Sequence, residues 1–86
     1  MNAADLALVA TIPNGGTHVL TNVAQGRSPW HGWENGTVAN SGEGADAYGV
    51  RARIITKCRE RGLLTPENLL TEAGRAAVAA MEARLG

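Results

Sequence analysis

Hydrophobic residues recur at helical spacing in four segments of the chain, separated by clusters of glycine, proline and asparagine. Residues 3–12 are rich in alanine and leucine and end at Pro13-Asn14-Gly15-Gly16, which predicts a first short helix. A second helix is predicted over residues 17–25, with Thr17 as its N-cap and Gly26 just beyond its end.

The clearest amphipathic segment covers residues 45–61. At about 100° per residue, one arc is predicted to face the core; it holds Ala47, Val50, Ile54, Ile55 and Cys58. The remaining surface is basic and polar, so this helix is predicted to have a cationic outer face. Arg51 interrupts the apolar arc. Its side chain is expected to snorkel, to find a partner, or to lie where the helix leaves the body of the domain.

The last helix is predicted over Glu72–Leu85, where alanine is frequent and helix propensity is high. Thr71 is its expected N-cap, and Glu72 places an acid in its first turn. One side is lined by small and apolar residues, which suits close packing within the domain or across a dimer; these are Ala73, Ala77, Ala80, Met81 and Leu85.

The stretch before this helix supports two interpretations. Thr65-Pro66-Glu67 has the chemistry of a helix start, with threonine as the cap and proline at the first helical position. The same residues also fit a tight β-hairpin, in which residues 63–65 and 69–71 are strands and Pro66-Glu67-Asn68 is the turn. We favour the hairpin, because a helix from Pro66 would carry Gly74 in its interior at a cost of about 1 kcal/mol.

Residues 28–44 have no sustained period and are rich in glycine, which predicts a long connection within a single domain spanning residues 1–86. Trp30 and Trp33 lie in this connection. We expect them to pack against the body of the domain; the alternative is that they anchor a binding partner. Asn35-Gly36 could also close a short hairpin here.

The composition leaves little material for a core. Only 17 of the 86 residues are Leu, Val or Ile, so a homodimer that shares apolar surface is favoured over a monomer. Cys58 is the single cysteine, which fits a reducing compartment and a small buried hydrophobe. With no signal-like N-terminus and no apolar run of about 18 residues, we expect a cytoplasmic protein without a membrane span.

Basic residues are concentrated in the third predicted helix. The formal net charge is zero, yet five of the eight Lys and Arg residues lie between Arg51 and Arg61. A polyanion is therefore a reasonable partner for this helix, although the neutral total weakens the long-range attraction.

The order of these elements resembles the winged helix-turn-helix domains of MarR-type regulators. The resemblance lies in a basic helix, then Arg61-Gly62-Leu63, then Leu70-Thr71-Glu72-Ala73-Gly74-Arg75 at the start of an alanine-rich helix. Together with the tract Asn22-Val23-Ala24-Gln25-Gly26-Arg27-Ser28-Pro29-Trp30, these pieces also look like small winged-helix proteins of bacteriophages.

The resemblance implies a mostly α fold with a small β-hairpin as the wing, and a helix at residues 45–61 that enters the DNA major groove. Ala52 and Arg53 match base-facing positions, and Thr56 and Lys57 match groove-wall and phosphate contacts. The complete set of predicted DNA-binding residues is Tyr48, Arg51, Ala52, Arg53, Thr56, Lys57 and Arg59.

Catalytic and metal-binding patterns are weak in this sequence. His18, His31, Glu34 and Cys58 are the candidate groups, and none is paired at a spacing typical of zinc ligands or of a nucleophile with its base. We therefore predict a cofactor-free, non-enzymatic protein that binds duplex DNA as a regulator or accessory factor of a phage or mobile element. The alternative is a protein-interaction module of the same fold, such as a phage inhibitor of a host nucleic-acid or defence complex.

Overall fold

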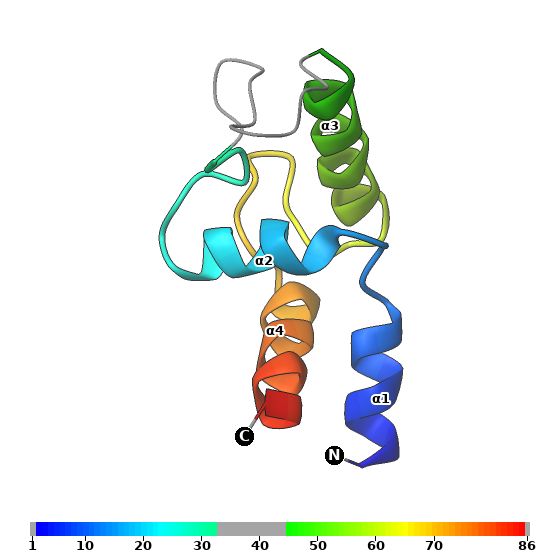
Figure 1. Ribbon diagram of the computed structural model, residues 1–86. Coiled ribbons are helices and arrows are strands. Elements are labelled where there is room, and N and C mark those ends of the chain that lie inside the picture. Colours follow the sequence, from blue (N-terminus) through cyan, green and yellow to red (C-terminus); the bar gives the residue numbers. More distant parts are fainter. Residues whose placement is uncertain (1, 33–44, 86) are drawn as a thin grey trace.

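The computed structural model describes residues 2–32 and 45–85, except for the side chains of residues 45–48, 84 and 85. Within this part the chain is mostly helical, as predicted, and its helices are α1 (Ala3–Ala10), α2 (Gly16–Ala24), α3 (Ala45–Glu60) and α4 (Glu72–Leu85). Figure 1 shows α2 crossing the centre, with α3 on one side and the antiparallel pair α1 and α4 on the other. Accordingly α2 packs against both α3 and α4, and α1 packs against α4.

The N-terminal helix α1 begins with a capping box formed by Asn2 and Asp5. The amide of Asp5 donates to Oδ1 of Asn2 at 2.8 Å, and the amide of Asn2 donates to Oδ2 of Asp5 at 3.4 Å. These bonds satisfy backbone donors that the first turn of a helix leaves open. The helix ends at Ala10, two residues before the predicted end, and Thr11 follows as its C-cap.

The second helix, α2, starts differently from the prediction. The predicted Thr17 cap is wrong, because the N-cap is Gly15, with φ +81° and no side-chain capping bond. The turn itself starts the helix: the amide of Gly16 donates to the carbonyl of Pro13 at 2.8 Å. A left-handed backbone angle is accessible to glycine at no steric cost, so Gly15 lets the chain turn directly from α1 into α2.

The chain reverses between α3 and α4. Leu64 and Leu70 form one isolated antiparallel bridge, and the amide of Thr65 donates to the carbonyl of Leu69 at 2.8 Å. The alternative of a helix beginning at Pro66 is wrong, since α4 begins only at Glu72. The predicted strands at residues 63–65 and 69–71 are not seen as strands in the described residues, where the pairing is limited to this bridge.

The fourth helix agrees with its predicted bounds and cap. The amide of Gly74 donates to Oγ1 of Thr71 at 2.9 Å, and the same hydroxyl donates to the carbonyl of Gly62 at 2.6 Å. Thr71 therefore caps α4 and also fastens it to the end of α3.

The core lies where α2, α3, the reversal and α4 meet. Its buried members come from all four parts of the chain: Val19, Leu20, Ile55, Cys58, Leu63, Leu64, Ala77, Val78 and Met81. Cys58 is fully buried, as predicted for a small core residue. Val50 departs from the predicted arc, because it is 38% exposed while the core-facing side of α3 is made by Arg51, Ile55 and Cys58.

Candidate nucleic-acid interface

Three of the predicted DNA-binding residues share the exposed side of α3. Arg53, Thr56 and Lys57 are exposed, and Ala52 beside them is half-buried. Residues three and four apart on a helix are neighbours on its surface, so Arg53 lies next to both Thr56 and Lys57. Tyr48 lies in the first turns of α3, and its side chain is outside the described part of the structure.

Arg51 does not belong to this exposed face. It is only 4% exposed, and its Nη1 donates to the carbonyl of Pro29 at 3.5 Å. Of the three interpretations open from the sequence, the structure supports a partner within the domain. Burial lowers the pKa of the Arg51 guanidinium, and the neighbouring Cys58 opposes that shift. Arg51 therefore joins α3 to the segment after α2, and we exclude it from the DNA-binding face.

Arg59 is also engaged within the protein. It is half-buried, and its Nε donates to Oδ1 of Asn68 at 2.8 Å. Asn68 is the residue of the turn with a positive φ, +66°. Arg59 thus stabilises the chain reversal, and its guanidinium is only partly available to an external partner.

Beside the exposed face of α3 lies a hollow of about 510 Å³, here called the basic hollow. One wall is the turn Pro13-Asn14-Gly15, and the other is a stripe of α3 and the residue after it, made by Val50, Arg53, Ile54, Lys57 and Arg61. Arg61 was missed in the predicted set, although its spacing of four residues from Lys57 indicates the same stripe. Its Nη1 donates to the carbonyl of Thr11 at 3.1 Å.

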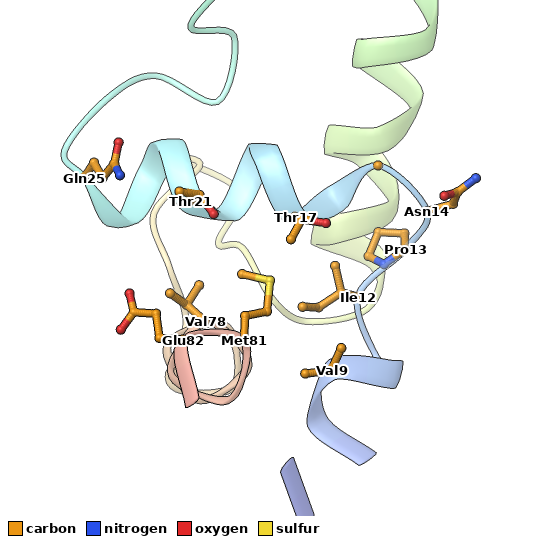
Figure 2. Close-up of a pocket in the computed structure, with 11 residues that line it drawn as sticks. Val9, Ile12, Pro13, Asn14, Thr17, Thr21, Gln25, Val78, Met81 and Glu82 are labelled. Carbon is orange, nitrogen blue, oxygen red and sulfur yellow. The ribbon is translucent and has the colours of Figure 1, made fainter. Parts of the chain in front are cut away.

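A second hollow of about 630 Å³ lies on the other side of that turn, between α1, α2 and α4 (Figure 2). We call it the apolar hollow, because Val9, Ile12, Val78 and Met81 contribute much of its lining. Of the described residues that line it, Glu82 alone is charged. The two hollows share the turn at residues 13–15, but the lining of one is basic and the lining of the other is largely apolar.

The structure tests the predicted packing of the two tryptophans against the body of the domain only at Trp30. Trp30 packs against the core cluster, and its amide donates to Oγ of Ser28 at 3.0 Å. Packing against the body of the domain is therefore confirmed for Trp30. Trp33 lies outside the described residues, as does Asn35-Gly36.

The candidate catalytic groups that the structure describes differ in their exposure. His18 is exposed on α2, whereas Cys58 is fully buried, and burial raises the pKa of its thiol. Glu34 lies outside the described residues. In the part of the chain that the structure covers, no group of three or more His, Cys, Asp or Glu side chains could hold a metal ion.

In comparisons with known proteins, the chain matches no family model, no curated protein and no solved structure. Among residues 2–32 and 45–85, no helix has both the length and the apolar character needed to cross a membrane.

Proposed function

We propose that this protein binds duplex DNA through the exposed face of α3, with Arg53, Thr56 and Lys57 as its central contacts. The observation that supports this most is the exposure of two cations one helical turn apart, with a hydroxyl side chain next to them. A major groove about 12 Å wide admits an α-helix, where arginine pairs with guanine edges and lysine neutralises phosphates.

The chain reversal supports a winged version of this proposal. The Leu64–Leu70 bridge and the bond from Thr65 to Leu69 hold a hairpin-like turn beside the end of α3. In the proposed fold this turn is a short wing, α2 and α3 are the helix pair, and α4 packs against α2 on the side away from α3 (Figure 1). An exposed acid, Glu67, lies in the turn, so phosphate attraction there is weak and α3 supplies most of the affinity. A regulatory or accessory role in a phage or mobile element fits this small domain.

The test begins with a pool of random-sequence duplexes, from which bound DNA is selected and its affinity measured by fluorescence anisotropy against salt. With two or three cations engaged per chain, the slope of log affinity against log salt is expected to be about −2 to −3. Arg53→Ala should weaken the selected site by about 1 to 3 kcal/mol and relax its base preference. Lys57→Ala should weaken all duplexes alike and reduce the slope by about 1.

Arg27→Ala is the matched control, because Arg27 is exposed on the segment after α2, does not line the basic hollow, and loses the same charge. It should leave the affinity within about twofold of the wild type. A chain that binds no duplex in a salt-dependent manner, or an Arg27→Ala variant as weak as Arg53→Ala, would contradict the proposal.

A second candidate function, docking on a host protein complex, is favoured by one observation. Leu69 is 63% exposed beside the turn, although leucine is normally placed inside. In affinity purification from the native host, this function predicts that Leu69→Ser abolishes capture of a partner while Arg53→Ala leaves it intact. The opposite result would favour DNA.

A homodimer remains part of the proposal, and α1 is the surface that suits it. Seven of its eight residues are apolar and none is buried, with Leu6 exposed at 55%. Burying such a face would supply apolar area that a small domain lacks. Light scattering on the wild type should give twice the chain mass, and Leu6→Lys should shift it to the monomer; a monomeric wild type at high concentration would exclude the dimer.

A further inference from the structure

The charge of the basic hollow is unusual for this chain. Among the described residues that line it, Arg53, Lys57 and Arg61 are cationic and none is acidic. The protein as a whole has equal numbers of basic and acidic residues, eight of each. A surface region of average composition would therefore carry no net charge, whereas the described lining of this hollow carries a positive net charge.

The three cations follow one another along α3, with Arg61 in the turn just beyond its last residue. They are four residues apart, so with a rise of about 1.5 Å per residue their backbone positions span roughly 12 Å. Asn14 and Gly15 belong to the turn that also lines this hollow. Cations from one segment and uncharged polar groups from the other suit a ligand with negatively charged oxygens.

We propose that the basic hollow is a phosphate-binding site, in which Arg53, Lys57 and Arg61 hold the oxygens and Asn14 contributes its amide donor. Phosphate matches arginine and lysine better than a carboxylate does here, because its several oxygens can be shared among three separate donors. Val50 and Ile54, which line the hollow beside the cations, provide an apolar surface for the sugar to which a phosphate is joined.

This site shares Arg53 and Lys57 with the proposed DNA-binding face, and so rests partly on the proposed function. Two sources of phosphate fit the same chemistry. One is the backbone of a bound duplex, which would pass between α3 and the turn at residues 13–15. The other is a free phosphorylated molecule. Binding of α3 in the DNA groove does not require Asn14 or Arg61, whereas binding of phosphate in the basic hollow uses both.

The experiment uses the full chain and two matched substitutions, each of which converts an exposed amide into a carboxylate. Asn14→Asp places negative charge at the turn that lines both hollows, whereas Gln25→Glu places it at the far end of α2, where it lines the apolar hollow alone. Inorganic phosphate is titrated into each protein and followed by NMR of the backbone amides. In parallel, duplex affinity is measured at fixed salt.

We expect inorganic phosphate to shift the backbone amide resonances of Asn14, Gly15 and Lys57 in the wild type and in Gln25→Glu. The affinity for phosphate should be lower by about fivefold or more in Asn14→Asp. Shifts scattered over every exposed cation, or equal affinity in the two variants, would overturn the proposal. If phosphate binds as expected and duplex DNA does not, the site serves a free phosphorylated ligand and the proposed function fails alone. If duplex binds but phosphate shifts nothing, and the two variants bind duplex equally, the site fails alone.

Discussion

Arg59 and Asn68 connect α3 to the chain reversal through a bond of 2.8 Å from Nε to Oδ1. Asn68 meets two requirements at once, since it accepts this bond and also has a left-handed backbone, with φ +66°. Asparagine adopts that conformation more readily than most residues. One residue therefore links the direction of α3 to the shape of the turn that brings the chain back to α4.

Substitutions at Asn68 should separate these two roles. Asn68→Gly keeps the backbone conformation and loses the bond, at a cost of about 1 kcal/mol. Asn68→Ala loses both, so its cost should be greater by about another 1 kcal/mol. Urea denaturation measures the free energy of unfolding for each. Equal stability of the two variants would mean that the left-handed angle is not retained in solution.

A second prediction concerns Gly74 and Gly49, two helical glycines that differ in the space available for a Cβ atom. A Cβ at Gly74 would overlap the carbonyl oxygen of Leu63 and lie 3.1 Å from the Leu63 carbonyl carbon. Gly74→Ala should therefore destabilise the fold by about 1 to 3 kcal/mol, despite the higher helix propensity of alanine. A Cβ at Gly49 would meet only Nη1 of Arg53, at 3.8 Å, so Gly49→Ala should stabilise by up to about 1 kcal/mol.

Thermal or urea unfolding of both variants gives the comparison. Because the substitution is the same, helix propensity cancels and the difference reports the close approach of α4 to the backbone at Leu63. If Gly74→Ala were as stable as Gly49→Ala, the tight contact between these segments would be refuted.

Local chemistry made some elements predictable from the sequence. Thr71 caps α4 at the predicted residue, and the turn at Pro66 forms because proline and asparagine suit a reversal. Gly74 was treated only as a cost to a helix, yet it is the residue that permits close contact with Leu63. The start of α2 was misplaced because Pro13 and Gly15 begin the helix through the backbone, without a side-chain cap.

Long-range contacts decided the rest of the candidate site. Hydrophobicity alone places Val50 inside and leaves Arg51 unresolved, but the Pro29 carbonyl lies 22 residues from Arg51 in sequence, and no local spacing reveals that bond. Arg61 is the last residue of the predicted third helix and was left out of the predicted DNA-binding set. Its place in the basic hollow depends on the turn at residues 13–15, which only the folded chain brings near it.

Arg51 and Arg53 offer a third prediction, since they are two residues apart and differ greatly in burial. Arg51 is 4% exposed, so Arg51→Ala should leave a cavity and an unpaired Pro29 carbonyl, and cost about 2 to 4 kcal/mol of unfolding free energy. Arg53→Ala, on the exposed face, should change stability by no more than about 0.5 kcal/mol. Chemical denaturation of the pair is the measurement. Similar losses in both would show that Arg51 is not buried in solution.

The last prediction follows from the buried thiol of Cys58. Burial raises its pKa above the ordinary value of 9.0, while the positive charges of Arg61 and Arg51 oppose the shift. The folded protein thus holds the thiol proton more tightly than the unfolded chain. This contribution to stability is complete below the ordinary thiol pKa and is lost as pH rises through the raised value in the folded state.

The free energy of unfolding should therefore fall as pH rises above the ordinary thiol pKa, and it should fall less steeply in Cys58→Ala. Comparing slopes cancels the cost of the cavity that alanine leaves, and it also cancels the pH dependence that the two proteins share. Alkylation gives an independent check, because a fully buried thiol reacts only when the native structure opens. Parallel pH profiles for the two proteins, together with rapid alkylation of the native chain, would place Cys58 at the surface and contradict the packing of α3 described above.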